Sequence, residues 1–272
     1  MKATIQGTLK VCALALAALA FSSCLTTMEK KVIDPPWRPS VDPNAAAASN
    51  KPPVGQVAPV YFSKDEAPVI DGDFSDWEGL PGVNARVMVY GGLFDPKNSD
   101  GLFVTRTDGT AIYLYADITD DDPGVNALPA PQGWRGDSIE FFFGTDTLYH
   151  TFYKNTDKRV RIVPKSKTVK GAYEVCVNDS TVPNDSVKAA IVYGDTGYRI
   201  EAAIPLSLLN AKQLKNRQKV RLEFQINDAD GGKERTRLIH WMSEKDASYM
   251  DASTWGDGRV VPLADAKMGG ER

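Results

Sequence analysis

The sequence has few of the residues that build disulfide frameworks and zinc sites. Its 272 residues include three cysteines (Cys12, Cys24 and Cys176) and two histidines (His150 and His240). A structural zinc site usually takes four Cys or His ligands, and a disulfide scaffold takes several paired cysteines in a short chain. The sequence indicates neither, so we expect the hydrophobic core to hold the fold together.

An excess of positive charge is also missing. The chain carries 32 basic and 35 acidic residues, for a net charge of -3. A protein that binds a phosphate backbone normally presents a basic surface, so we expect no nucleic-acid partner. The hydrophobic fraction of 42% and the charged fraction of 25% are typical of a globular protein and exclude a wholly disordered chain.

An apolar run near the N-terminus is too short to be a membrane helix. Residues 11–21 are apolar and follow Lys2 and Lys10, whereas a bilayer span needs about 20 such residues. This pattern is typical of a secretory signal. The following Ser22, Ser23 and Cys24 resemble a bacterial lipobox, which implies a lipoprotein signal peptide over residues 1–23 and lipidation of Cys24. A plain secretory signal is the alternative.

Residues 24–60 show no apolar periodicity. They include seven prolines, namely Pro35, Pro36, Pro39, Pro43, Pro52, Pro53 and Pro59. Such a composition predicts a semi-rigid, disordered tether. Leu25 stands where a retention signal would place Asp, so we expect a lipid anchor in the cell envelope, at the outer membrane if the cell has one.

The rest of the chain alternates with period two. Residues 219–228 place Val220, Leu222 and Phe224 on one face and polar residues on the other, as half-buried strands do. Further strands are predicted at 111–118, 138–143 and 197–204, and weaker ones at 85–90, 149–154, 159–163, 172–177, 187–193, 236–241 and 259–263. We predict an all-β fold, a jelly-roll-like antiparallel β-sandwich, as one domain over 61–264 with a tail over 265–272.

Four segments of this body, in order, resemble the carbohydrate-binding module family 9 domains. They are residues 69–77 (VIDGDFSDW), 113–122 (YLYADITDDD), 133–142 (GWRGDSIEFF), and 198–205 with 224–230 (YRIEAAIP and FQINDAD). The resemblance covers most of residues 61–263. It implies a β-sandwich that binds sugar between two aromatic rings, with bound calcium in some members.

The family pattern maps onto individual residues of this chain. The first clamping aromatic is Trp134, before the segment DSIE. The second falls on Tyr249 in SYMDASTWG, where the pattern has Trp. Arg161 matches a sugar-binding arginine, and Asn227 and Asp228 match the family's NDA turn.

Each residue also has a structural alternative. Trp134 could cover one end of the sandwich, Tyr249 could pack on Trp255, and Arg161 could be an ordinary outward strand residue. A pyranose presents an apolar face and a rim of hydroxyls, which suits flat aromatic rings combined with planar polar groups. Trp77 and Trp241 are predicted to be core residues.

Acidic residues raise the question of a metal. The family analogy favours Asp71 and Asp73 as ligands of a structural calcium ion, although they lack EF-hand spacing. Asp120, Asp121 and Asp122 form a denser group in a loop, and oxygen-rich loops suit a hard cation. The alternative is a solvated turn.

We predict a binding protein and not an enzyme, because no catalytic signature appears. The expected partner is a polysaccharide or oligosaccharide, such as cellulose or xylan fragments. Because little sequence follows the last strand before Arg272, a glycoside hydrolase partner would be a separate protein. One alternative is a haem b domain using Met88, Met242, Met250, His150 or His240. Another is a structural envelope lipoprotein that docks a second protein.

Overall fold

The computed structural model describes residues 52–232 and 234–269. The predicted signal peptide, Cys24 and most of the predicted tether lie outside these residues. Strand β1 (Val57–Phe62) already begins inside the range predicted as tether, and helix α1 (Leu263–Gly269) occupies the start of the predicted tail. No helix within the described part of the chain is long and apolar enough to span a membrane.

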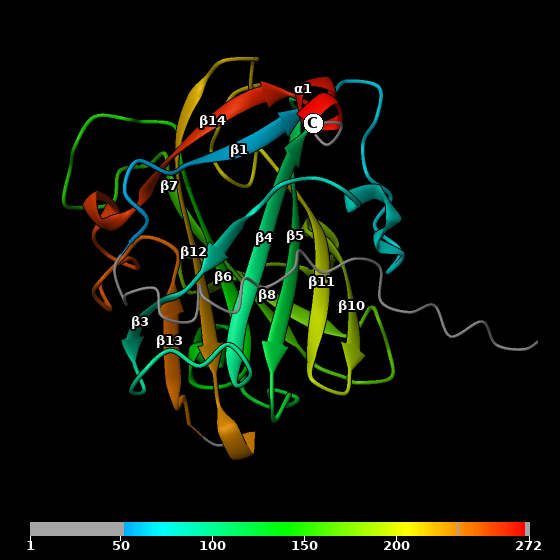
Figure 1. The fold of residues 1–272 in the computed structure, drawn as a ribbon, viewed down its shortest axis with the longest axis vertical. Helices are drawn as coiled ribbons and strands as arrows, with labels where there is room; N and C mark the ends of the chain where they lie inside the picture. Colours follow the sequence, from blue (N-terminus) through cyan, green and yellow to red (C-terminus); the bar gives the residue numbers. More distant parts are fainter. Residues whose placement is uncertain (1–51, 233, 270–272) are drawn as a thin grey trace, which may run out of the picture. The chain divides into compact units, whose positions relative to one another are not determined.

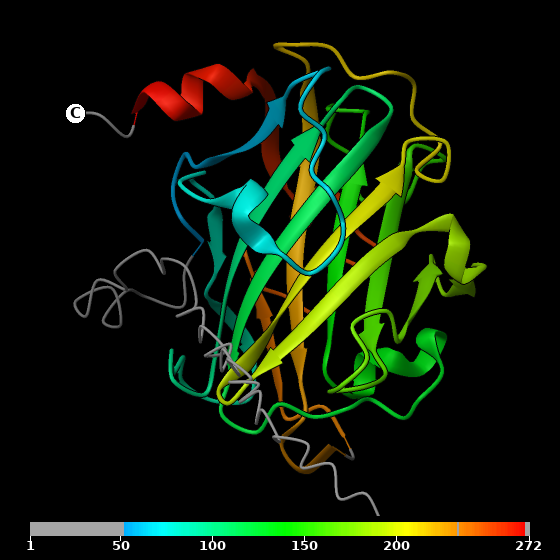
Figure 2. The same cartoon turned by 90° about the vertical axis from the view of Figure 1, so that its right-hand side faces the viewer.

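The described chain is built on one 14-stranded sheet that curls until its two halves face each other (Figures 1 and 2). The order along it is β10-β11-β5-β4-β1-β14-β12-β6-β7-β8-β9, with β13 on β12 and β3, and β2 on β4. The remaining strands are β2 (Val83–Ala85), β3 (Val87–Tyr90), β4 (Ser99–Thr107), β5 (Ala111–Asp120), β6 (Ser138–Gly144), β7 (Asp157–Pro164), β8 (Tyr173–Val177), β9 (Ser180–Thr181), β10 (Lys188–Gly194), β11 (Gly197–Pro205), β12 (Lys219–Asp228), β13 (Arg237–His240) and β14 (Gly256–Pro262).

Short 3-10 helices connect several of these strands. They are η2 (Phe74–Trp77), η3 (Ala130–Arg135), η4 (Asn184–Ser186), η5 (Asp230–Gly232) and η6 (Ala252–Thr254). The all-β sandwich expected from the sequence is confirmed. The pairings are antiparallel except at β1, which runs parallel to both of its neighbours, β14 and β4.

The main core lies between the two halves of the sheet. Phe103 of β4 stacks on Phe224 of β12 with ring centroids 4.9 Å apart, and Trp241 packs against the same Phe224. Alternation along β12 therefore places its apolar side chains in the core and its polar ones on the opposite face. Trp241 is fully buried, as predicted.

A second cluster covers the other face of β4 and β5. Trp77 of η2 stacks on Tyr115, with centroids 5.6 Å apart, and is buried as predicted. Because β4 is covered on both faces, its sequence does not alternate cleanly, and we did not predict it. The strand predicted at 149–154 is wrong, since this segment is a loop in which Tyr149 and Phe152 are exposed.

Candidate functional site

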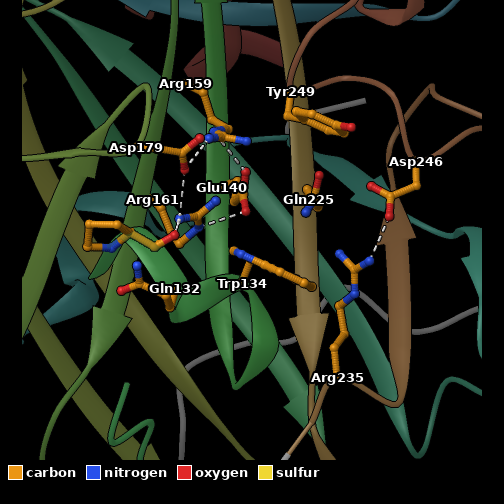
Figure 3. Close-up of a pocket in the computed structure, with 11 residues that line it drawn as sticks. Gln132, Trp134, Glu140, Arg159, Arg161, Asp179, Gln225, Arg235, Asp246 and Tyr249 are labelled. Carbon is orange, nitrogen blue, oxygen red and sulfur yellow. Dashed lines mark hydrogen bonds and ion pairs between the residues drawn. The ribbon is translucent and has the colours of Figure 1, made fainter. Parts of the chain in front are cut away.

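A cavity of about 390 Å³ lies over the polar face of β6, β7 and β12, within the ~300–1,000 Å³ range of small-ligand sites. The rings of Trp134 and Tyr249 lie on opposite sides of it, and Figure 3 shows both nearly edge-on. They are 40% and 46% exposed. The other lining residues are Pro131, Gln132, Glu140, Arg159, Arg161, Asp179, Gln225, Arg235 and Asp246.

Helix η3 presents Trp134. The carbonyl oxygen of the preceding Gly133 accepts a hydrogen bond from the Ser138 hydroxyl at 2.9 Å. Arg161 Nη1 donates to the carbonyl of Ala130, also in η3, at 2.9 Å. Two bonds from the sheet therefore fix the turn, so the indole ring is held in place before any ligand arrives.

The loop before β14 presents Tyr249. The carbonyl of its neighbour Ser248 accepts hydrogen bonds from Tyr153 Oη at 2.6 Å and Trp255 Nε1 at 3.0 Å. Trp255 has its ring contacts with Tyr153 and Phe142. The ring of Tyr249 lines the cavity.

The wall between the two aromatics is one row of polar residues on neighbouring strands. Gln225 of β12 pairs in register with Glu140 of β6, and Glu140 pairs with Arg161 of β7. Residues directly opposite in a sheet project from the same face, so these three side chains meet. Gln225 Nε2 is fixed by a 2.8 Å hydrogen bond to Asn227 Oδ1.

Glu140 is the charged centre of this wall. Its Oε1 accepts hydrogen bonds from Arg161 Nε at 2.8 Å and Asn227 Nδ2 at 3.2 Å, and Arg159 Nε lies 3.3 Å from Oε2. Burial alone would raise the pKa of Glu140, but Arg161, Arg159 and the hydrogen bonds together lower it. Glu140 Oε2 is buried and accepts no hydrogen bond of ordinary geometry from the described residues, so Arg159 is its charged partner.

Asp179 holds the two arginines from the other side. It follows Asn178 in the tight turn between β8 and β9, where both residues have positive φ (47° and 61°). Asn and Asp tolerate that conformation better than other non-glycine residues. Asp179 Oδ1 contacts Arg159 Nη2 and lies 3.2 Å from Arg161 Nη1. The arginines are thus braced between Glu140 and Asp179.

Arg235 and Asp246 form the remaining wall. Arg235 Nη2 donates to Asp246 Oδ2 at 2.6 Å, and its Nη1 donates to Asn227 Oδ1 at 3.1 Å. Its guanidinium carbon lies 5.2 Å from the centroid of the Trp134 ring. Figure 3 shows this ion pair beside the indole.

The structure places Trp134, Tyr249 and Arg161 around the cavity but puts Asn227 and Asp228 elsewhere. Asn227 is fully buried behind the wall and bonds Gln225, Glu140 and Arg235. It orients wall residues and does not line the cavity. Asp228 is one residue further along β12, so its side chain points to the opposite face.

Asp228 belongs instead to a buried acidic cluster. Carboxylate oxygens of Asp120, Asp137 and Asp228 lie within 4.8 Å of one another, and all three residues are buried. Asp137 accepts hydrogen bonds from the backbone amides of Gly124 and Ala229. Neither oxygen of Asp228 accepts a hydrogen bond of ordinary geometry from the described residues, and Arg237 Nε lies 4.0 Å away.

Burial and mutual repulsion raise the pKa values of these carboxyls. The pKa is about 8 for Asp120, about 7 for Asp228 and about 6 for Asp137, with desolvation as the largest cause in each. Three carboxylate oxygens around one point, with Asp228 contributing one that accepts no hydrogen bond of ordinary geometry, fit a hard divalent cation such as Ca²⁺. Asp120 was noted in the sequence, but Asp137 was not.

Asp71 and Asp73 have local roles in this structure. Asp71 Oδ1 accepts a hydrogen bond from the amide of Asp73 at 2.8 Å, and Asp73 Oδ1 caps η2 through the amide of Ser75 at 3.1 Å. Within the described ranges, neither belongs to a group of three or more metal-type ligands. The acidic cluster is therefore the better calcium candidate.

Both histidines named as possible haem ligands are buried. His150 Nε2 lies 2.8 Å from Asp157 Oδ2, and His150 Nδ1 lies 2.7 Å from the Leu148 carbonyl. His240 is fully buried, with Nδ1 3.7 Å from Glu223 Oε1. Met88 packs in the main core.

Comparison with protein families identifies the class to which this β-sandwich belongs. The model of the carbohydrate family 9 binding domain-like family matches residues 70–262. This is well over half of the chain, which therefore belongs to that family.

Solved structures show the same fold. A family 9 carbohydrate binding module from Caldicellulosiruptor kristjanssonii in complex with cellotriose is similar, with a TM-score of 0.61 and 22% identity, covering 76% of this chain and 94% of that one. The same module in complex with glucose gives the same TM-score and identity, with 96% of that chain covered.

Curated relatives are much longer than this chain. The exoglucanase XynX of Acetivibrio thermocellus is 25% identical over 206 residues, which are 74% of this chain and 17% of that protein. The endo-1,4-beta-xylanase A of Thermoanaerobacterium saccharolyticum is 24% identical over 194 residues, 70% of this chain and 15% of its own. This chain therefore spans less than a fifth of the length of these enzymes.

Proposed function

We propose that the cavity between Trp134 and Tyr249 binds a sugar unit of a neutral plant-type β-glycan, such as a cellulose or xylan fragment. The observation that carries this proposal is a pair of aromatic rings on opposite sides of a cavity whose wall is a row of polar side chains. The rings take the apolar faces of a pyranose, and its hydroxyls bond the polar side chains that line the cavity. The solved module that resembles this chain is in complex with cellotriose.

We propose that the site binds without catalysis. A glycosidase needs a carboxylic acid with a raised pKa to protonate the leaving group. The pKa of Glu140 is lowered by Arg161 and Arg159 against the effect of burial. Asp179 and Asp246, the other carboxylates of the cavity, pair with arginines.

Titration calorimetry of the full chain with cello- and xylo-oligosaccharides tests this proposal. The parent protein should bind at least one series, and Trp134→Ala should abolish measurable binding. Tyr149→Ala is the matched control, because Tyr149 is an exposed aromatic that does not line the cavity. Equal affinity of Trp134→Ala and the parent would overturn the proposal.

We further propose that the acidic cluster of Asp120, Asp137 and Asp228 holds a structural calcium ion. The orphaned oxygens of Asp228 support it. Bound cation would stabilise the fold, because ligands that bind only the native state raise its stability. Addition of Ca²⁺ to chelator-treated protein should raise the melting temperature, and Asp228→Asn should remove this response. An unchanged melting temperature in the parent would contradict the site.

The chain is also proposed to be a lipoprotein of the cell envelope, anchored through Cys24, that works beside a separate glycoside hydrolase. The lipid anchor rests on the N-terminal sequence alone, and the hydrolase partner rests on the similarity to the exoglucanase and the xylanase. Labelling cells with a radioactive fatty acid should mark the parent protein and leave Cys24→Ser unmarked.

A further inference from the structure

A second cavity adjoins the first on the far side of Arg235. Its volume is about 530 Å³, and it is lined by Val89, Tyr90, Trp134, Glu234, Arg235, Glu244, Lys245 and Asp246. Trp134, Arg235 and Asp246 line both cavities. The ion pair of Arg235 and Asp246, with the edge of Trp134, is therefore a partition between two parts of one site.

The second cavity has an aromatic residue of its own. Tyr90 is 57% exposed at the end of β3 and pairs in register with Leu238 of β13. The chain turns at once through Gly91, whose φ is 104° and where a Cβ would lie 2.5 Å from the Thr236 carbonyl. A side chain is excluded there by both conformation and space. The turn and the strand pairing thus hold Tyr90 at the cavity.

Hydrogen bonds to neighbouring residues hold Arg235, and with it the partition between the cavities, in place. Arg235 is bonded to Asp246 at 2.6 Å and to the buried Asn227 at 3.1 Å. The neighbouring Glu234 is paired with Arg135 of η3, the helix that carries Trp134. The walls of the second cavity are thus fixed to the elements that build the first.

The charged residues that line the second cavity indicate which kind of ligand it can bind. Three carboxylates (Glu234, Glu244 and Asp246) line it with two cations (Arg235 and Lys245). Carboxylates accept hydrogen bonds and repel anions, so the cavity favours hydroxyl donors over a uronic acid. An exposed tyrosine ring supplies an apolar surface of the kind that a sugar face covers.

We propose that this second cavity is a further subsite for the same neutral oligosaccharide, with Tyr90 as its platform. A chain held at Trp134 then continues past Arg235 toward Tyr90. The inference rests on the proposed sugar-binding function of the first cavity and adds to it a dependence on chain length. Longer oligosaccharides bind more tightly because they reach both cavities.

Calorimetry with two probes of one series, cellobiose and cellopentaose, or xylobiose and xylopentaose, tests the subsite. For the full chain we expect the pentasaccharide to bind about tenfold more tightly, the scale of one aromatic contact. Tyr90→Ala should remove this gain and leave the disaccharide affinity unchanged. Tyr90→Phe should keep the gain, and Tyr149→Ala is the control for loss of an exposed aromatic.

The outcomes separate the two proposals. Equal affinity for both probes, or a gain that survives in Tyr90→Ala, overturns the subsite while disaccharide binding lost in Trp134→Ala still supports the sugar site. Absence of binding by every probe overturns both. Because Tyr90 is more than half exposed, Tyr90→Ala should melt at the same temperature as the parent, and a circular dichroism melt verifies that its fold is intact.

Discussion

Two buried carboxylates of this sandwich, Glu140 and Asp228, lie in opposite electrostatic environments. Glu140 in the cavity wall is 1% exposed, and Arg161 and Arg159 compensate its charge. Asp228 in the acidic cluster is 2% exposed, lies beside the carboxylates of Asp120 and Asp137, and has Arg237 Nε 4.0 Å away. Burial works to raise the pKa of both groups, yet the pKa of Glu140 is lowered and that of Asp228 is raised to about 7.

The opposite pKa shifts of Glu140 and Asp228 show which of the two sites contains its own compensating charges. A buried charge is tolerated when a partner and hydrogen bonds replace water. The cavity wall contains its own partners, so it is preorganised and suited to a neutral ligand that adds no charge. The acidic cluster has too little positive charge of its own, so its stability depends on protons or on a cation from solution.

Removing the Glu140 charge should lower the free energy of unfolding more than any other change considered. Glu140→Gln leaves Arg161 and Arg159 buried with only part of their compensation, and breaking a buried ion pair from one side costs about 3 kcal/mol. Urea unfolding at pH 7 should show that loss, together with weaker sugar binding. An unfolding midpoint equal to that of the parent would show that the wall does not depend on this carboxylate.

The corresponding change in the acidic cluster should act in the opposite direction. With chelator at pH 8, above the raised pKa of Asp228, Asp228→Asn removes a repelled charge and should stabilise the protein by at least about 1 kcal/mol. The same urea experiment measures it. Destabilisation under chelation would mean that the carboxylate has a favourable partner in the native protein.

The metal-free cluster should also make stability depend on pH. The native pKa values of about 8, 7 and 6 for Asp120, Asp228 and Asp137 lie above the unfolded value of about 3.9. The native state therefore holds protons that the unfolded state has released, and this contribution, complete below pH 4, is lost as pH rises through 6 to 8.

This dependence is best measured as a difference between two proteins. Parent and Asp228→Asn, both with chelator, should differ by about 1 kcal/mol more at pH 8 than at pH 6. Titrating groups outside the cluster cancel in the difference, whereas Asp120 and Asp137 interact with Asp228 and contribute to it. A difference that is constant across this range would show that Asp228 does not titrate there.

The strands that frame the cavity could be predicted from the sequence, whereas only some of the residues that line it could. Alternation in residues 219–228 predicted β12 and separated its polar face from the core. It did not show that Gln225 lies opposite Glu140, because register depends on the partner strand. Alternation in SIEF shows Glu140 as a polar residue of a strand, but it does not indicate that Glu140 lines a site.

Residues from loops were the hardest to predict. Asp179 joins the site through a turn between β8 and β9, and Asp246 joins it through the loop after β13. Neither turn has a sequence pattern that points to the cavity. Trp134 and Tyr249 were found only because the resemblance named their positions, and the same resemblance pointed to Asn227 and Asp228, which lie away from the cavity.

The smallest expected effect concerns the two aromatic walls. Trp134 is an indole, whereas Tyr249 stands where the family pattern has a second Trp, so the two sides of the cavity offer unequal surfaces. Tyr249→Trp should tighten disaccharide binding about threefold, by roughly 0.5–1 kcal/mol of additional aromatic contact. Calorimetry measures this change, and stability should be unaffected because Tyr249 is 46% exposed. Weaker binding would mean either that the phenol hydroxyl contributes to binding or that the cavity is too narrow for an indole. Tyr249→Phe separates these causes, because it removes the hydroxyl without adding width.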